Sequence, residues 1–458
     1  MKPNAFDVSA RNTSVYSMLQ RRESEGRPIR VGVVGAGATG RAIALQLGTP
    51  VPGIRLAGMA NRTPKHAERA FKEAGIREWE VARTASDAES RISRGVPVIT
   101  DDSSVLTRCN AIDIIVEVTG SVDFGASVVL DAIGHAKPVV LVNAELDSLI
   151  GPILKAKADE AGVVITHTDG DEPGVAMTLF RYVQSVGLRP VAAGNIKGMV
   201  DYYRTPDTQR EFAAKHDQDV RKVTSFADAT KLSMETTVLA NATGFHVARR
   251  GMCGPACGYV RDLAKLLPAD AMLNGGIVDY SVGAAPHTGG FVVVHEENPY
   301  KRTQLAYYKL GDGPFYVFYT PFHLPHIQLP STIARAVIHA DPTVAPIAGP
   351  SCEVVTVAKR QLKAGERLDG VGGFCAYGLI ENHATARASN ALPIAMSDDC
   401  VLLRNMSKDE VVTFDDVKLP PSRLRDELWS EQHRRWPVTG RADIHAERLT
   451  PEFAATVE

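Results

Sequence analysis

Short apolar runs alternate with helical patterns along the first 170 residues of the chain. The apolar runs predict buried strands, at 29–35, 54–61, 96–102, 111–120, 137–143 and 162–168. Helical patterns separate most of them, at 39–47, 63–75, 121–135 and 150–161. Strands that alternate with helices are joined by right-handed crossovers into a parallel sheet. We therefore expect residues 29–170 to form an open, doubly wound α/β domain, preceded by a polar helical arm over 1–28.

The pattern changes twice beyond residue 170. The middle third mixes half-exposed strand patterns with helical stretches at 207–216 and 226–244, which predicts an α+β substrate-binding domain over 171–344. The last third has short strands and many turns, which predicts a small β domain over 345–425. The charged tail, 426–458, is expected to be partly disordered or to lie against a partner.

Composition limits the classes of function. The chain has 458 residues and a formal net charge of -2, which gives no reason to expect nucleic acid or an acidic membrane as a partner. No apolar run is long enough to span a bilayer, and the N-terminus lacks the apolar core of a secretory signal. The 6 scattered cysteines are too few for a disulfide scaffold, so we expect a cytoplasmic protein that acts on a small molecule.

Three glycines stand between the first strand and the first helix, in "IRVGVVGAGATGRAIALQL" (29–47). Gly35 allows the tight turn, Gly37 lets the backbone approach a pyrophosphate, and Gly40 lets the helix pack closely on the strand. The helix that opens with Ala38 and Thr39 offers unpaired N–H groups to an anion. The context predicts a Rossmann-type dinucleotide site rather than a purely structural turn.

The ends of later strands suggest which cofactor binds and where it lies. An NAD site usually has an acid after the second strand, but this chain has Asn61 and Arg62 there. Arg62 can neutralise a 2′-phosphate, which favours NADP(H), although it can also be an ordinary solvated loop charge. The remaining predicted cofactor contacts follow the fourth and fifth strands; they are Thr119, Gly120 and Asn143.

Acidic residues gather where the crevice of the sheet is expected. Asp171 and Glu172 lie in "HTDGDEPG" (167–174), and Glu145 follows the fifth strand. Carboxylates at this edge can orient substrate hydroxyls or hold a divalent cation. They can equally stabilise a helix N-terminus or be ordinary loop polarity. We assign no metal ligands here and leave the need for a divalent metal open.

The stretch 226–244 carries the strongest candidate for proton transfer. Asp228, Lys231 and Glu235 are spaced to share one face of a helix. An acid and an amine on one face can move a proton to or from a hydroxyl as it becomes a carbonyl, whereas the alternative is a surface salt bridge. Candidate residues for a substrate phosphate or carboxylate are Asn195, Lys197 and Arg204.

Five of these segments together resemble the homoserine dehydrogenase family. They are "VGVVGAGATG", "DIIVEVTG", "VLVNAE", "GNIKG" and "FADATKL". In that family an acid and a lysine of the last motif act on the substrate hydroxyl; here Asp228 and Lys231 are one residue closer together. The family also has a catalytic lysine where this sequence has Ala144, which argues against plain homoserine dehydrogenase activity. The resemblance implies a homodimer formed through the middle domain.

The C-terminal region resembles the SAF module, a small β-clip fold, through 357–369 and 401–417. Homoserine dehydrogenase-like proteins with this module form a subgroup. Some members resemble deoxyxylulose-phosphate reductoisomerase of isoprenoid biosynthesis, which converts 1-deoxy-D-xylulose 5-phosphate to methylerythritol 4-phosphate with NADPH.

We therefore expect an NADP(H)-dependent oxidoreductase that acts on a small polyhydroxylated substrate, with or without a phosphate group. Reductoisomerase-like activity is one specific form of this hypothesis. The alternatives are homoserine dehydrogenase itself and a non-catalytic NADP-binding protein whose SAF module recognises a partner.

Overall fold

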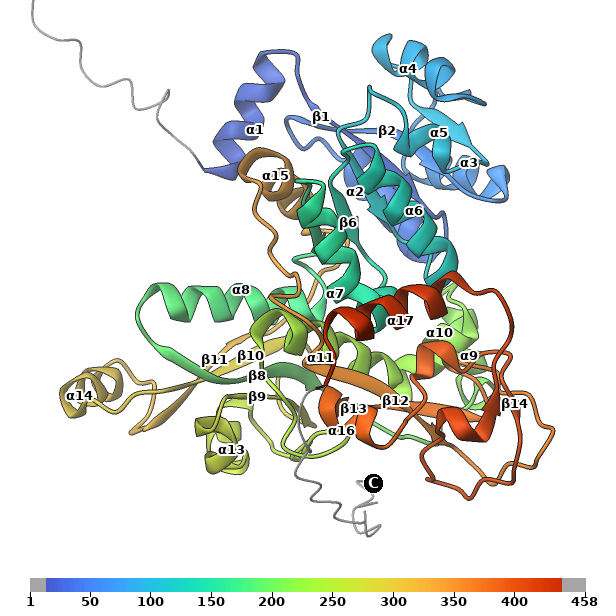
Figure 1. Cartoon of the computed structure of the whole chain (residues 1–458). Helices are drawn as coiled ribbons and strands as arrows, with labels where there is room; N and C mark the ends of the chain where they lie inside the picture. Colours follow the sequence, from blue (N-terminus) through green and yellow to red (C-terminus); the bar gives the residue numbers. More distant parts are fainter. Residues whose placement is uncertain (1–13, 439–458) are drawn as a thin grey trace, which may run out of the picture.

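The computed structural model describes residues 14–438, and its upper half in Figure 1 is built on one parallel sheet. The strands are β1 (Ile29–Val34), β2 (Ile54–Ala60), β3 (Glu80–Val81), β4 (Val98–Thr100), β5 (Ile114–Glu117), β6 (Val139–Leu141) and β7 (Ile165–His167). Their order across the sheet is β3-β4-β2-β1-β5-β6-β7. The doubly wound parallel sheet is thus confirmed. The strand order reverses between β1 and β5, which creates the crevice where such sheets bind ligands.

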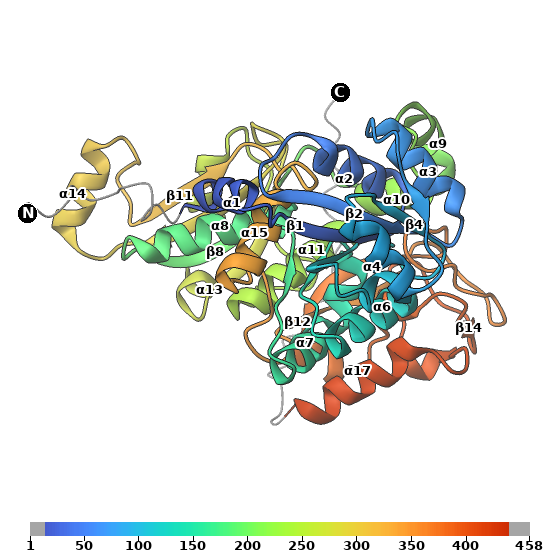
Figure 2. The same ribbon diagram turned by 90° about the horizontal axis from the view of Figure 1, so that it is seen from above.

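Helices cover both faces of this sheet (Figure 2). They are α2 (Ala38–Gly48), α3 (Pro64–Glu73), α4 (Ala85–Ser93), α5 (Ser104–Thr107), α6 (Val122–Gly134) and α7 (Ala144–Glu160). Helix α15 (Leu329–His339) returns from the middle of the chain, meets α1 (Val15–Ser24) and joins the core beneath β1. The nucleotide half is therefore completed by a segment more than 150 residues beyond β7 in the sequence.

A four-stranded sheet forms the second unit, in the order β11-β10-β8-β9. Its strands are β8 (Arg189–Lys197), β9 (Ile277–Val282), β10 (Gly290–His295) and β11 (Phe315–Thr320). Helices α8 (Glu172–Ser185) and α11 (Thr230–Thr243) pack against it, and α12 (Leu263–Leu266), α13 (Ala269–Leu273) and α14 (Pro299–Tyr307) lie at its periphery. This arrangement is the α+β pattern expected of the middle third.

The helix predicted over 226–244 is two helices with a break between the predicted catalytic residues. Helix α10 (Val220–Ala227), which follows α9 (Pro206–Lys215), ends at Asp228, and Ala229 adopts φ 66°. Helix α11 then begins at Thr230, whose N–H donates to Asp228 Oδ1 at 3.0 Å. The left-handed residue turns the chain, so the prediction that Asp228 and Lys231 share one helix face is wrong.

The C-terminal third is a small β unit packed against α11. Strands β12 (Cys352–Ala358) and β13 (Ala376–Asn382) pair antiparallel, as do β14 (Val401–Leu402) and β15 (Val417–Lys418). Helix α16 (His383–Ala388) follows β13, and all 6 cysteines of the chain are free thiols. The resemblance to the SAF module stays a prediction.

The described part of the predicted tail forms a helix that packs on the nucleotide domain. Helix α17 (Leu424–Arg435) lies along α6 and α7, against which it buries Leu428 and Gln432 (Figures 1 and 2). Residues 1–13 of the predicted arm and 439–458 of the tail lie outside the described residues.

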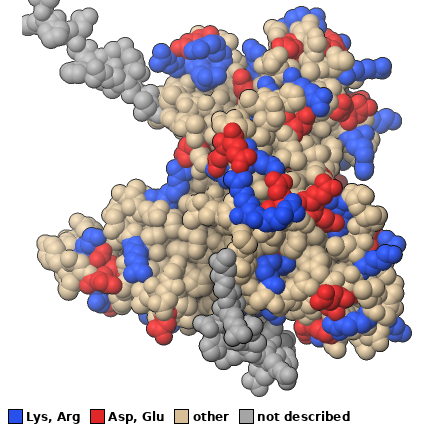
Figure 3. Space-filling model, viewed as in Figure 1, with Lys and Arg blue, Asp and Glu red and all other residues tan. Residues whose placement is uncertain are grey.

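Lys and Arg alternate with Asp and Glu on the face shown in Figure 3. Among the residues described, no helix has the length and apolarity needed to cross a membrane.

Gln432 repairs the hydrogen bonding of α7 around a proline. Pro152 stands inside α7, and the Gln432 amide is inserted just beside it. Ile153 N donates to Gln432 Oε1 at 3.2 Å, and Gln432 Nε2 donates to the Leu149 carbonyl at 3.1 Å. One buried side chain therefore bridges the Ile153 N–H and the Leu149 carbonyl, which, next to the proline, bond to Gln432.

We predict that Gln432→Ala lowers the free energy of unfolding by about 1–3 kcal/mol, because two buried backbone groups lose their partner. Chemical denaturation followed by circular dichroism measures the change. The exposed Glu427→Ala on the same helix is the control and should change stability by less than about 0.5 kcal/mol. Equal effects of the two substitutions would contradict the role of Gln432.

Candidate active site

The glycine loop after β1 has the geometry of a pyrophosphate cradle. Gly35 has φ 115°, and a Cβ there would lie 2.8 Å from the Val118 carbonyl oxygen. A Cβ on Gly40 would clash with the Gly35 carbonyl, whereas a Cβ on Gly37 would meet nothing within 4 Å. Gly37 caps α2 without a side-chain hydrogen bond. The first N–H groups of α2 therefore face open space, and the loop fits a dinucleotide.

Asn61 and Arg62 differ in how they relate to this loop. Asn61 Oδ1 accepts from Ala36 N at 3.1 Å, and Asn61 Nδ2 donates to the Thr63 carbonyl at 2.9 Å. Asn61 thus fixes the loop itself. Arg62 is exposed and makes no ion pair with the part of the chain that the structure describes, which leaves its guanidinium available to a ligand.

A buried carboxylate organises the ends of β5 and β6. Glu117 Oε1 accepts from the backbone N–H of Thr119 at 2.8 Å and from its hydroxyl, and Glu117 Oε2 accepts from Asn143 Nδ2 at 2.9 Å. Asn143 Oδ1 also caps α7 at Leu146 N, 3.1 Å away. Burial raises the pKa of Glu117. Thr119, Gly120 and Asn143 therefore shape the crevice, and their contact with a cofactor stays a prediction.

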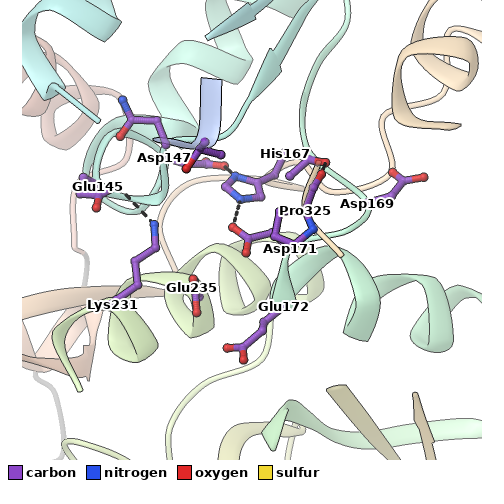
Figure 4. A network of polar contacts seen from close by, with 12 residues as sticks. Glu145, Asp147, His167, Asp169, Asp171, Glu172, Lys231, Glu235 and Pro325 are labelled. Atoms are coloured by element: carbon purple, nitrogen blue, oxygen red, sulfur yellow. Dashed lines mark hydrogen bonds and ion pairs between the residues drawn. The ribbon is translucent and has the colours of Figure 1, made fainter. Parts of the chain in front are cut away.

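Two predicted catalytic residues from different halves of the molecule meet in the crevice. Lys231 Nζ, from α11, lies 3.3 Å from Glu145 Oε2, from the first turn of α7 (Figure 4). Their side chains are 10% and 13% exposed. Burial alone would lower the pKa of Lys231, but Glu145, Glu235 and Asp171 raise it above its usual range. Lys231 therefore carries a proton at neutral pH.

The residues predicted to bind a substrate anion are instead paired with a carboxylate. Lys197 contacts Glu172 and lies 3.8 Å from Glu235 Oε2, and Asn195 Nδ2 donates to Glu172 Oε2 at 2.5 Å. Arg204 pairs with Asp201 at 2.9 Å, at the surface. The structure therefore brings Lys197 and Asn195 into the acidic cluster and leaves Arg204 outside it.

Glu235 is the carboxyl group of the cluster that differs most from an ordinary one. Burial, Asp171 and Glu172 together raise its pKa well above the usual value. Its Oε2 is buried and accepts no hydrogen bond from the described residues. Lys197, by contrast, lowers the pKa of Glu172 against the effect of burial. Within the cluster, the pKa values of Glu235 and Glu172 are therefore shifted in opposite directions.

A buried histidine lies between two aspartates behind Lys231. His167 Nδ1 lies 3.0 Å from Asp147 Oδ2, and His167 Nε2 lies 3.0 Å from Asp171 Oδ2 (Figure 4). Burial alone would lower the pKa of His167, but the two carboxylates raise it to about 9. His167 in turn lowers the pKa of Asp171. The imidazolium thus orients Asp171 towards the cluster as a carboxylate.

Asp228, which we predicted beside Lys231, is bound by the C-terminal unit. Its Oδ2 lies 2.8 Å from Lys359 Nζ, and Lys359 also donates to the carbonyls of Arg204 and Gly373. Both side chains of the ion pair are buried. Asp228 therefore joins the β unit to the start of α11 and is not part of the Lys231 cluster.

The acidic cluster does not have the compact geometry of a metal site. Within residues 14–438, Asp171, Glu172 and Glu235 do not form a group of three ligand atoms lying within 4.8 Å of one another. The ammonium of Lys197 lies close to Glu172 and Glu235, where it supplies the positive charge. These residues do not fit a divalent cation, and we derive no step through one.

The sequence analysis missed Lys222, which lies between the glycine loop and the cluster. Its Nζ lies 3.4 Å from Thr39 Oγ1, in the first turn of α2. The side chain is half-buried and makes no ion pair with the residues described; burial and Lys231 lower its pKa. Its neighbour in the sequence, Asp219, caps α10 and orients this helix. No local pattern marked Lys222, because it reaches the loop from the other domain.

The middle third of the chain matches a known family model. Residues 170–329 match the catalytic domain of oxidoreductase DRL. This segment contains Asp171, Glu172, Lys197, Lys231 and Glu235. The chain therefore carries an oxidoreductase catalytic domain, and the prediction of an oxidoreductase is confirmed. The match does not extend to the homoserine dehydrogenase and SAF resemblances, which stay predictions.

Solved structures show only distant similarity to the chain. A scyllo-inositol dehydrogenase of Lactobacillus casei with NAD(H) and scyllo-inositol is 14% identical, with 58% of this chain and 73% of that one covered and a TM-score of 0.34. A myo-inositol dehydrogenase of the same organism is 13% identical, with 70% of this chain and 89% of that one covered and a TM-score of 0.37. A probable dehydrogenase of Thermotoga maritima is 11% identical, with 70% of this chain and 91% of that one covered and a TM-score of 0.40. Likeness at this level carries no argument about activity. No curated protein matches the chain significantly.

The His167 contacts predict a specific dependence of stability on pH. The folded pKa of about 9 lies above the ordinary value of 6.5, so the stabilisation is complete below pH 6.5 and is lost as the pH rises through 9. We expect the free energy of unfolding to fall over this range by at most about 3 kcal/mol. Urea denaturation at several pH values measures it.

His167→Gln should flatten this decline, and the exposed His216→Gln should leave it as in the wild type. A wild-type stability that stays constant between pH 6.5 and 9 would show that His167 is not held as an imidazolium.

Proposed function

We propose that this protein is an NADP(H)-dependent oxidoreductase that interconverts a hydroxyl and a carbonyl group on a small polyhydroxylated substrate. Lys231 is the group that donates a proton to the substrate oxygen in reduction. The observation that carries the proposal is the buried pair of Lys231 and Glu145, which joins the catalytic domain to the nucleotide domain. The pair lies on the side of the crevice where α7 begins, immediately after β6.

The bound nicotinamide would supply or accept the hydride. The α2 amides behind Gly37 would hold its pyrophosphate, and Lys222, next to Thr39, would add a positive charge there. Arg62, exposed at the end of β2, would neutralise the 2′-phosphate that distinguishes NADP from NAD.

The protonation states of the cluster suit proton transfer at Lys231. Glu145 and Asp171 hold Lys231 as an ammonium, so it can give a proton to the alkoxide that forms as hydride arrives. Glu235 lies one helical turn from Lys231, and burial together with Asp171 and Glu172 raises its pKa. It is the residue we propose to return a proton to Lys231 or to donate a hydrogen bond to a neighbouring substrate hydroxyl.

The charge balance of the cluster favours an uncharged polyol over a phosphorylated substrate. Lys197 and Arg204 each pair with a carboxylate, so neither is free for a phosphate group. Buried carboxylates are strong acceptors for hydroxyl donors. 1-Deoxy-D-xylulose 5-phosphate and L-homoserine are therefore comparison substrates in a screen led by polyols. Ala144, at the start of α7, supplies no second amine for homoserine oxidation.

We also propose that the protein is a homodimer formed through the middle domain. The support is a group of exposed aromatic side chains on α14, where Tyr300, Tyr307 and Tyr308 are at least 67% exposed.

We predict that Lys231→Met lowers kcat by a factor of about 10² to 10⁴ on any substrate found in the screen, because proton transfer loses its donor. Absorbance of reduced nicotinamide measures the rate, and fluorescence titration measures the Kd of NADPH. The Kd should stay within about twofold of the wild type, since Lys231 acts on the substrate side. The exposed Lys265→Met is the control. Retention of full kcat by Lys231→Met would refute this role.

We predict that Lys222 and Arg62 contribute differently to cofactor binding. Lys222→Met should raise the Kd of both NADPH and NADH about 10- to 100-fold, the effect of one charge-assisted hydrogen bond. Arg62→Ala should raise the Kd of NADPH alone, because NADH lacks the 2′-phosphate. Fluorescence titration measures both, with the exposed Lys215→Met as control. A Kd for NADPH that neither substitution changes would contradict this placement of the cofactor.

A further inference from the structure

A second cluster of ionisable side chains lies where the C-terminal helix meets the β unit. Glu353 lies on β12, His383 begins α16 and His433 lies on α17. Glu353 Oε1 lies 2.5 Å from His383 Nδ1 and 2.9 Å from His433 Nε2. One ligand atom from each residue lies within 4.8 Å of the other two. Glu353 and His383 are buried, and none of the three contributes to the Lys231 cluster.

The hydrogen bonds of His433 require a cation inside this cluster. His433 Nδ1 lies 2.7 Å from the Trp429 carbonyl oxygen, which can only accept, so Nδ1 carries the hydrogen. A neutral ring then has a bare lone pair on Nε2, which faces the Glu353 carboxylate oxygen at 2.9 Å. Two acceptors at this distance repel each other unless a proton or a metal ion lies between them.

The donor set and its surroundings favour a metal ion over a proton. Two imidazole nitrogens and one carboxylate oxygen are typical ligands of Zn²⁺. The outer contacts are those that orient such ligands: the second nitrogen of His433 donates to a carbonyl, and the second oxygen of Glu353 forms an ion pair with Arg387 at 2.7 Å. Arg387 thereby occupies Oε2, and Oε1 faces both imidazole nitrogens. The Trp429 ring lies 3.8 Å from the His433 ring and shields it from water.

We propose that Glu353, His383 and His433 bind a divalent cation of the zinc type. The ion enters as the proton between Oε1 of Glu353 and Nε2 of His433 leaves. The hydrogen that His383 Nδ1 shares with Oε1 moves to His383 Nε2, which has no partner among the described residues, so that Nδ1 can bind the ion; one coordination position stays available for water. Because His433 lies on α17 next to Gln432, the ion fastens this helix, and through it α7, to the β unit. The inference does not depend on the proposed oxidoreductase activity.

The test uses the full chain, stripped with EDTA and dialysed, and ZnCl₂ alone as the probe. Isothermal titration calorimetry should give one zinc per chain with a Kd of micromolar or below, and zinc should raise the midpoint of thermal unfolding. His383→Gln and His433→Gln should each weaken binding at least tenfold and abolish the thermal shift. The exposed His135→Gln should behave as the wild type.

The glutamine variants are chosen because a glutamine amide at 433 can still donate to Glu353, which keeps the fold. Co²⁺ added to the wild-type chain is the measurement that needs no variant, and it should give the visible absorption of a low-coordinate nitrogen- and oxygen-ligated site. Absence of zinc binding by the wild type overturns the proposal. Zinc binding that both histidine substitutions leave unchanged also overturns it, and the cluster is then a proton-held ion pair.

Discussion

The ion pair between Lys231 and Glu145 is the contact on which the arrangement of the two halves depends. Each side chain projects from the first turn of its helix. Helix α11 packs on the four-stranded sheet, whereas α7 packs on the parallel sheet. Removing two charges from water costs several kcal/mol for each ion, and a single partner does not offset it. Glu235 and Asp171 also stabilise the Lys231 ammonium, and Lys222 stabilises the Glu145 carboxylate. The pair is therefore maintained only while both domains hold their places.

Helix α11 explains why such a polar cluster exists in the interior. Every residue from Thr230 to Ala242 is buried, because the helix lies between α7, α8 and the C-terminal strands. Its polar side chains therefore need partners inside the protein. Ser233 donates to the Gly378 carbonyl at 3.1 Å, and Asn241 accepts from Ser351 N at 2.8 Å. Glu235 Oε2 accepts no hydrogen bond from the described residues, and it is the atom that we propose for contact with a substrate hydroxyl.

The sequence predicts those features that depend on residues close together in the chain. The glycine loop is local, so Gly35, Gly37 and Gly40 indicate a strand, a turn and a helix by spacing alone. The end of the fifth predicted strand placed Glu145 at the crevice, but its pairing with Lys231 was not predicted, because it joins two helices 86 residues apart. The break at Ala229 was missed because an Asp such as Asp228 can lie inside a helix or cap one. Which of the two occurs here depends on the ion pair with Lys359, more than 100 residues away in the sequence. Lys222 and the cluster of Glu353, His383 and His433 depend on the same kind of distant packing.

The C-terminal third contacts the helices of the site through two residues: Lys359 at the start of α11 and Gln432 beside α7. Lys359 binds Asp228, three residues before Lys231, and so fixes where α11 begins. Gln432 is inserted into the backbone of α7, the helix whose first turn carries Glu145. The contact of Glu353 on β12 with His433 on α17 links the elements that carry these two residues. The C-terminal unit therefore contacts both helices that carry Lys231 and Glu145, although it contributes neither residue.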